Sequence, residues 1–349
     1  MSRETLTLVG APGSPYSRKL RAVLRYRRIP HLWVQAGGLE SRGLPKPRVE
    51  LLPQLVVRRE DGTFEARVDS TPLIRELESR YAGRSVVPPD PAVAFLDALL
   101  EDYADEWLTK AMFHYRWRFA PDVAKASAVL PRWRRTDQPE SQALELGRVF
   151  ADRQIRRLGV VGSNATTAAV IEESYRRLLR LLAMQLERSR FVLGGRPGAA
   201  DFGLFGQLTQ LAGFDPTPTG VALELAPRVV AWVEVVEDLS GLEPGDGDWT
   251  TRDAIPETLR ELLGEIGRVY APFLLANADA HARGAEVVEC TIDSQLWVQR
   301  PFPYQGKCLQ WLREGHAALT PDDRRAVDDV LAGTGCERLF AVSSLLGRR

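Results

Sequence analysis

The sequence predicts an α/β domain at the N-terminus, an all-helical domain after it, and a mostly helical extension at the C-terminus. Over residues 1–82, short β-branched and apolar runs alternate with segments of helical apolar spacing. The proline-rich stretch 82–91 that follows is typical of a linker. Across residues 92–240 the apolar residues recur at helical spacing. A turn-rich break then precedes residues 249–349, which we expect to form the extension.

The composition is that of a chain that can bury a sizeable core. Its 349 residues are 44% hydrophobic, and its 46 basic residues balance its 46 acidic residues. This balance gives no reason to expect a nucleic acid or an anionic membrane as partner. The sequence has no signal-like N-terminal stretch and no apolar run long enough to span a bilayer. Cys290, Cys308 and Cys336 are odd in number and widely spaced, which suggests neither a metal site nor a disulfide framework. A cytoplasmic protein is the simplest interpretation.

The first element is a strand that leads through a loop into the start of a helix. Thr5–Val9 is a β-branched and apolar run typical of a strand, and Gly10–Pro15 supplies the residues of a loop. The apolar residues that follow fall at helical spacing: Leu20, Val23 and Leu24. Ser14 is the expected N-cap of this helix, with Pro15 at the favoured first position. The open N–H groups and the dipole of the helix would favour an anion at the same place.

The loop sequence Ser14-Pro15-Tyr16-Ser17 lies where glutaredoxins and other thioredoxin-fold proteins carry Cys-Pro-Tyr-Cys. It resembles the Ser-Pro-Phe/Tyr-Ser loop of the plant-type and several bacterial glutathione S-transferases. The resemblance implies a thioredoxin-like N-terminal domain in which Ser14 stabilises the glutathione thiolate and Tyr16 belongs to the glutathione-binding loop. In the alternative interpretation, Ser14 is only a helix cap.

Two further strands are predicted after a strand at Ile29–Gln35. Leu55–Arg59 and Phe64–Val68 flank Asp61-Gly62, a strong hairpin signal. Pro53 stands just before this hairpin, as proline often does at a sheet edge. In the thioredoxin-like fold a cis-proline occupies this point. The resemblance therefore implies a cis bond before Pro53 and a backbone at Leu52 that pairs with the cysteinyl unit of glutathione.

Asp69-Ser70 precedes a helix with an apolar face, and either residue is a good cap. Glutathione transferases have Glu/Asp-Ser at this point, where it holds the γ-glutamyl end of glutathione. Ser70 and the open N–H groups can take the α-carboxylate, and Asp69 can pair with the α-ammonium. The alternative is plain capping. Because the Ser14 loop and Pro53 precede these residues in the expected order, we favour the binding interpretation.

The second domain is predicted to be helical throughout. The helices are expected at 93–118, 144–158, 168–186 and 229–239, with a less regular stretch at 119–140. The segment Phe191–Phe202 resembles the transferase stretch that opens the buried helix of the second domain. Asp201 would bond back to the N-cap backbone as in a capping box, although Gly198 replaces the usual Ser or Thr.

The extension lies beyond the resemblance, which covers residues 5 to about 240. It should contain a helical segment at 256–282 with a break at Pro272, a hairpin around Asp293-Ser294, and two more helices. The aromatic loop 301–304 follows the hairpin. We expect the extension to roof the electrophile pocket, or to cover a dimer surface, or else to enlarge the core.

The resemblance implies a glutathione S-transferase, with glutathione as co-substrate, a small hydrophobic electrophile, no metal, and a homodimer. Ser14 would lower the thiol pKa, and a thioltransferase would instead need a cysteine there. The electrophile pocket would lie between the domains, with Tyr103, Trp107 and His114 as candidates, although aromatic residues at helical spacing are more often core. A noncatalytic binding or assembly module of the same fold is the alternative function.

Overall fold

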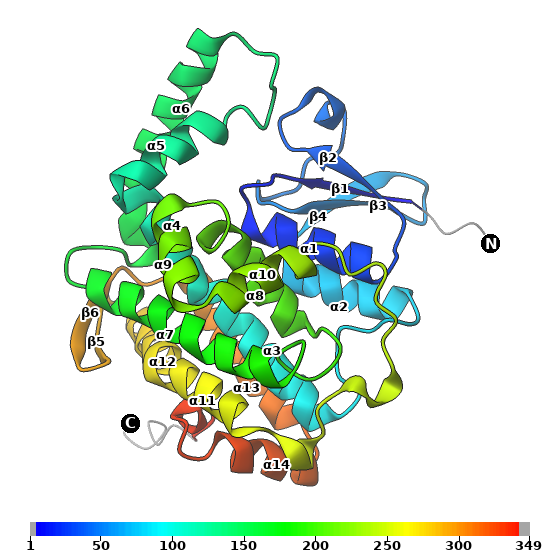
Figure 1. Ribbon diagram of the computed structural model, residues 1–349, viewed down its shortest axis with the longest axis vertical. Coiled ribbons are helices and arrows are strands. Elements are labelled where there is room, and N and C mark those ends of the chain that lie inside the picture. The colour runs from blue at the N-terminus through cyan, green and yellow to red at the C-terminus, as the bar shows by residue number, and fades with distance from the viewer. Residues whose placement is uncertain (1–4, 342–349) are drawn as a thin grey trace.

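The N-terminal domain of the computed structural model, which describes residues 5–341, is built on a four-stranded sheet. Its strands run in the order β2-β1-β3-β4 and comprise β1 Leu6–Gly10, β2 His31–Gln35, β3 Gln54–Arg58 and β4 Phe64–Val68. β1 is parallel to β2 and antiparallel to β3, which is antiparallel to β4. Helices α1 (Pro15–Tyr26) and α2 (Ser70–Arg80) lie between the sheet and the helical domain (Figure 1). The predicted thioredoxin-like order of strands and helices is confirmed.

The second domain is all-helical, as predicted. Its helices are α3 Pro91–Glu106, α4 Leu108–Arg118, α5 Ala120–Val129, α6 Glu140–Ile155, α7 Ala168–Arg188, α8 Ala199–Leu211, α9 Pro216–Leu225 and α10 Pro227–Val236. One continuous helix was expected over 93–118, but the structure has two, α3 and α4, separated at Trp107. The stretch expected to be irregular contains α5, since Pro121 sits in the first turn, where proline removes no helical hydrogen bond. Together α5 and α6 form an arm that projects from the body beside β2 (Figure 1).

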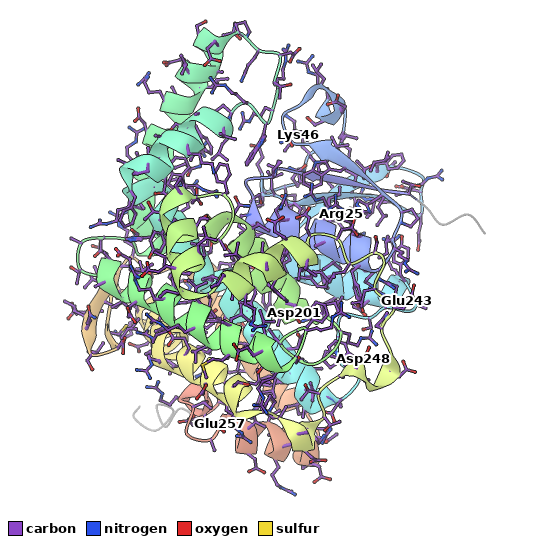
Figure 2. The ribbon with its side chains drawn as sticks, in the orientation of Figure 1. Arg25, Lys46, Asp201, Glu243, Asp248 and Glu257 are labelled. Carbon is purple, nitrogen blue, oxygen red and sulfur yellow. The ribbon has the colours of Figure 1, made fainter. Side chains whose placement is uncertain are left out.

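Helix α8 is buried along its whole length, and its start is stabilised from two directions. Asp201, labelled in Figure 2, lies in the first turn of α8. It accepts hydrogen bonds from the backbone N–H groups of Gly198 and Val192, both at 2.9 Å. Asp97 on α3 accepts from the next two backbone N–H groups of α8, at 3.0 and 3.2 Å. A Cβ atom on residue 198 would lie 2.3 Å from Asp97 Oδ1. The cap that Ser or Thr would supply is therefore replaced by the buried carboxyl of Asp97, which requires glycine at 198.

The extension adds four helices and a hairpin within the described residues. They are α11 Glu257–Glu265, α12 Ala271–Ala282, β5 Val288–Ile292, β6 Gln295–Gln299, α13 Pro303–Ala318 and α14 Pro321–Leu331. The break expected near Pro272 takes the form of a π-helical turn, Ile266–Tyr270. The predicted hairpin is confirmed: Asp293 and Ser294 have φ of 51° and 61°, as in a two-residue type I′ turn.

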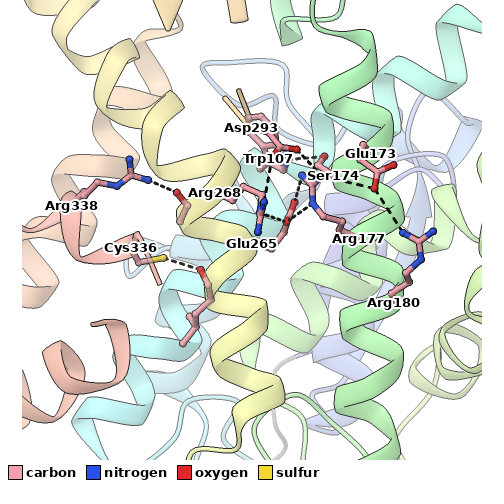
Figure 3. A network of polar contacts seen from close by, with 12 residues as sticks. Trp107, Glu173, Ser174, Arg177, Arg180, Glu265, Arg268, Asp293, Cys336 and Arg338 are labelled. Atoms are coloured by element: carbon pink, nitrogen blue, oxygen red, sulfur yellow. Dashed lines mark hydrogen bonds and ion pairs between the residues drawn. The ribbon is translucent and has the colours of Figure 1, made fainter. Parts of the chain in front are cut away.

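The extension packs into the same core as the helical domain. Arg177 on α7 donates to both oxygens of Glu265 at 2.7 and 3.0 Å, and to Asp293 in the hairpin turn at 2.8 Å (Figure 3). Burial raises the pKa of Glu265 to about 7, against the opposing charge of Arg177. The segment that begins the extension is also fixed, since Gly195 N–H donates to Asp248 O at 2.7 Å. The extension thus enlarges the core.

In residues 5–341 no helix has the length and apolar character to cross a membrane.

Candidate functional site

The three N-terminal motifs meet at one end of the strands, which we call the sheet edge. Val9 pairs with Gln54, and Gln54 pairs with Val68 on its other side, so the three residues form a row across β1, β3 and β4. The chain continues from this row into the Ser14 loop after β1 and into Asp69-Ser70 after β4, while Leu52-Pro53 precedes it at β3. Because neighbouring strands lie about 4.8 Å apart, the motifs are side by side in space.

Ser14 is the N-cap of α1. Its Oγ accepts a hydrogen bond from the backbone N–H of Ser17 at 3.3 Å, and Pro15 is the first residue of the helix. This bond uses a lone pair of the hydroxyl, so the O–H hydrogen stays available to donate. The residue is half-buried. Capping and donation to an anion are therefore compatible in this geometry, and the cap alone does not account for the hydroxyl's full hydrogen-bonding capacity.

The backbone of the Ser14 loop is held from the helical domain. Arg116 on α4 donates to Gly13 O at 3.0 Å, and Gln210 on α8 donates to Pro12 O at 3.0 Å. Arg116 in turn forms a buried ion pair with Asp215, with N···O distances of 2.9–3.0 Å. These contacts fix the loop that carries Ser14. Neither Arg116 nor Gln210 belongs to a recognisable sequence motif, because an isolated polar residue within a helix leaves no pattern.

The segment that connects α5 to α6 in the arm also contacts the Ser14 loop. A Cβ atom on Gly13 would lie 2.6 Å from Leu130 and 2.8 Å from the Trp133 ring, so both side chains pack directly on the loop. Trp133 also contacts Phe214, with ring centroids 5.1 Å apart. Leu130, Trp133 and Phe214 are each half-buried. They form an apolar cluster beside Ser14 that the sequence pattern did not reveal.

The Leu52–Pro53 peptide bond is cis, as the resemblance implied. Pro53 is buried and Leu52 is half-buried. Among residues 5–341, no protein group hydrogen-bonds to the backbone N–H or C=O of Leu52. Leu52 lies just before β3, at the end of the sheet, so these two groups can pair locally with the backbone of an extended peptide.

Asp69 occupies the N-cap position of α2, but its side chain does not cap the helix. Instead, Asp69 Oδ2 accepts a hydrogen bond from the hydroxyl of Tyr304 in the extension at 2.7 Å. The plain-capping alternative is thus wrong for Asp69. Ser70 is buried at the first position of α2, whose N-terminal turn receives no side-chain cap. An anion could therefore bind the open N–H groups of this turn.

A buried ionic network joins α1, α2 and α3 behind the sheet edge. Lys19 Nζ lies 2.8 Å from Glu101, 2.5 Å from Asp105 and 3.0 Å from the Thr71 hydroxyl. Arg75 pairs with the second oxygen of Glu101 at 2.7 Å. Burial alone would lower the pKa of Lys19, but the two carboxylates raise it. The network stabilises the charged forms of Lys19 and Glu101 and anchors the site's helices to the second domain.

Tyr16 points from the Ser14 loop into the domain interface. Its hydroxyl donates to the backbone carbonyl of Asp105 at 2.8 Å, and burial together with the charges of Glu106 and Asp105 raises its pKa well above the usual range. Gln305 of the extension donates to the side chain of Glu106 at 3.0 Å. The Tyr16 hydroxyl is therefore engaged within the protein, and its backbone N–H, in the first turn of α1, is the group it can offer to a ligand.

Tyr103 and Trp107, two candidates for the electrophile pocket, lie in the core. They are 2% and 1% exposed. The extension covers them: Tyr270 packs on both rings at 6.1 and 6.5 Å, and Trp297 packs on Trp107 at 5.2 Å. Both side chains thus belong to the core that the helical domain shares with the extension, and their part in an electrophile pocket stays a prediction.

His114 is also a core residue, fully buried on α4. One ring nitrogen lies 2.8 Å from the Ser163 hydroxyl and the other lies 3.2 Å from a Glu172 carboxylate oxygen. Burial lowers its pKa, against the effect of Glu172. Both ring nitrogens therefore have protein partners, and a part for His114 in an electrophile pocket stays a prediction. Within the described part of the chain, no cluster of three or more His, Cys, Asp or Glu side chains could hold a metal ion.

Two family models match the sequence. The model described as "Glutathione S-transferase, N-terminal domain" matches residues 8–85, and that described as "Glutathione S-transferase, C-terminal domain" matches residues 150–234. No curated protein matches the sequence. The two models cover the α/β domain and the later part of the helical domain, and neither reaches the extension.

Several solved structures are similar to the chain at low identity. A GST-like protein from Pseudomonas syringae is 20% identical, over 68% of this chain and 67% of that chain, with a TM-score of 0.41. A glutathione S-transferase from Rhodospirillum rubrum F11 is 19% identical, over 72% and 98%, with a TM-score of 0.37. A glutathione transferase family member from Pseudomonas fluorescens Pf-5, solved with two glutathione bound, is 15% identical, over 68% and 94%, with a TM-score of 0.40.

Proposed function

Because the chain belongs to the glutathione S-transferase family, we propose that it binds glutathione at the sheet edge and transfers the thiolate to a hydrophobic electrophile. The observation that supports this most strongly is the row formed by Val9, Gln54 and Val68, which brings the three motifs together. Each motif offers a different chemistry: a hydroxyl at the start of α1, free backbone groups at Leu52, and a carboxylate beside the open N–H groups of α2.

In this proposal the cysteinyl unit lies between the Ser14 loop and Leu52. The free backbone N–H and C=O of Leu52 would pair with its backbone. The γ-glutamyl unit would reach α2, where Ser70 and the open N–H groups take its carboxylate and Asp69 takes its ammonium. These pairings match donors to acceptors and opposite charges to each other.

Ser14 would act on sulfur. The thiolate is the nucleophile, so its pKa must fall toward neutrality. The O–H of Ser14 would donate to the thiolate, and the N-terminus of α1 would add its dipole. The thiolate then attacks the electrophilic carbon, a C–S bond forms, and the leaving group departs with its electron pair.

We propose that the electrophile approaches Ser14 along the apolar cluster of Leu130, Trp133 and Phe214. Leu130 and Trp133 pack on the loop at Gly13, and all three are half-buried, whereas Tyr103 and Trp107 are covered by the extension. A flat aromatic electrophile would gain contact area there.

The test pairs retention on glutathione-agarose with turnover of a chloronitrobenzene, for the unmodified protein and for Ser14→Ala. We expect retention by both and turnover that falls about tenfold to a hundredfold in the variant, the loss of one hydrogen bond to a charged group. Retention without turnover in the unmodified protein would favour the noncatalytic module. Equal turnover in the two proteins would remove Ser14 from the mechanism.

We also propose a homodimer, as the family resemblance implies, and a location in the cytoplasm, which is the simplest interpretation of the composition and cysteine usage. Sedimentation velocity of the purified protein gives the oligomeric state, and fractionation of the native cells gives the location. A single monomeric species over a wide concentration range would contradict the first statement, and recovery with the membrane or secreted fraction would contradict the second.

A further inference from the structure

The extension places one side chain directly at the candidate glutathione site. Tyr304, in the first turn of α13, donates its hydroxyl to Asp69 Oδ2 at 2.7 Å, across 235 residues of sequence. Both side chains are half-buried. The contact joins the extension to the N-terminal domain at the residue that would meet the γ-glutamyl ammonium.

The position of Tyr304 is fixed by its neighbours. Asn277 accepts from Phe302 N–H at 2.8 Å and donates to Phe302 O at 3.0 Å, which pins the turn before α13. Gln305 is anchored on Glu106, donating to its backbone carbonyl at 3.1 Å and its carboxyl at 3.0 Å. The Tyr304 ring meets Trp311 edge-on at 6.1 Å. The hydroxyl is thus presented to Asp69 by a rigid segment.

Asp69 itself needs such support. Its backbone has φ of 79° and ψ of 109°, a conformation that costs free energy for a residue with a side chain. The carboxylate makes no bond to the helix it precedes. Tyr304 supplies the fixed contact that orients it.

We propose that Tyr304 is a positioning residue of the glutathione site, holding the Asp69 carboxylate in the orientation that receives the γ-glutamyl ammonium. This inference rests on the function proposed above. A carboxylate has two oxygens and about four acceptor positions, so the bond to Oδ2 leaves Oδ1 for the ligand. Burial and the charge of Asp69 raise the pKa of Tyr304, so its hydroxyl stays neutral. A neutral donor orients Asp69 without cancelling the negative charge that attracts the ammonium, which a lysine or arginine would do.

The test compares Tyr304→Phe with Tyr270→Phe by calorimetric titration with reduced glutathione. Tyr270 is a matched control: it lies in the same extension and also donates to a carboxylate, Asp102, at 2.7 Å, but it does not contact Asp69. We expect Tyr304→Phe to weaken glutathione binding about tenfold and Tyr270→Phe to leave it unchanged. Thermal unfolding of both variants checks that each is folded.

Two further readouts separate positioning from a general structural role. Cysteinylglycine, which lacks the γ-glutamyl unit, should bind Tyr304→Phe and the unmodified protein equally. Adding Tyr304→Phe to Asp69→Asn should cause no further loss, because the hydroxyl acts through the Asp69 carboxylate.

The outcomes are distinct. Glutathione affinity in Tyr304→Phe that is unchanged or tighter would overturn the positioning role while leaving the proposed function intact. Equal weakening of glutathione and of cysteinylglycine would also overturn it. An unmodified protein that binds no glutathione would overturn the proposed function and this inference with it.

Discussion

Replacing Gly198 by serine restores the residue that transferases usually carry at the start of the buried helix, yet we expect it to destabilise this protein. A Cβ atom at 198 would lie 2.3 Å from Asp97 Oδ1, closer than real Cβ contacts. Asp97 would have to move and would lose its bonds to Ala199 and Ala200. Overpacking costs about 1–3 kcal/mol, and each lost hydrogen bond about 1 kcal/mol. The serine cap regains about 1 kcal/mol, so the free energy of unfolding should fall by about 2–4 kcal/mol.

Urea unfolding followed by tryptophan fluorescence measures this change, provided that the denaturant dependence stays the same. The double variant Asp97→Ala with Gly198→Ser is the decisive companion, because removing the carboxyl makes room for the serine. We expect the double variant to be more stable than Gly198→Ser alone, so that the two changes are strongly non-additive. Two results would refute the conclusion that the Asp97 carboxyl takes the place of the usual cap. One is a Gly198→Ser protein as stable as the unmodified one, and the other is a double variant whose loss of stability is the sum of the two single losses.

Three further predictions concern the arm, a buried carboxyl and the extension. Trp133→Ala should raise KM for an aromatic electrophile several-fold and leave glutathione affinity unchanged; steady-state kinetics with each substrate varied decides this, and an unchanged KM would count against the cluster as the electrophile's contact. Burial, with the charges of Asp102 and Asp105, raises the pKa of Glu106 from 4.5 to about 8. Because the pKa of Glu106 is higher in the folded protein than in the unfolded chain, binding of its proton stabilises the folded state. This stabilisation is complete below about pH 4.5 and is lost as the pH rises toward 8. Over that pH range the free energy of unfolding should therefore fall less in Glu106→Gln than in the unmodified protein or in the control Glu314→Gln. Parallel curves for the three proteins would disprove the raised pKa of Glu106. A chain that ends at Gly241 should aggregate or lose cooperative unfolding in calorimetry, because it uncovers the core that Trp107 shares with the extension; a soluble, cooperatively folded product would contradict the shared core.

The sequence predicted the elements well where local signals were strong. Asp293-Ser294 between two β-like runs gave the hairpin, and Pro15 after Ser14 gave the start of α1. The row of motifs at the sheet edge followed from the family resemblance, because periodicity alone does not specify which strands pair. The interruption at Trp107 was missed, since apolar spacing continues through it.

The contacts between distant segments could not be predicted. Helical spacing shows that Trp107 faces an apolar environment, but it does not distinguish a pocket from the extension that packs there. The bond from Tyr304 to Asp69 and the support of the Ser14 loop by Arg116 depend on how the domains and extension dock. Docking is determined by the whole packed surface, and a single sequence carries no local signal for it.

The central claim is that Ser14 stabilises a glutathione thiolate, and the pKa of the bound thiol tests it most directly. The ultraviolet absorbance of the thiolate, followed against pH in the glutathione complex, gives this value for the unmodified protein, for Ser14→Ala and for the control Ser17→Ala. A free thiol of this kind has a pKa of about 8.5. We expect a bound value lowered toward neutrality in the unmodified protein and in Ser17→Ala, and raised again by about 1–2 units in Ser14→Ala. A bound thiol that titrates like free glutathione, or that is unaffected by Ser14→Ala, would contradict the claim.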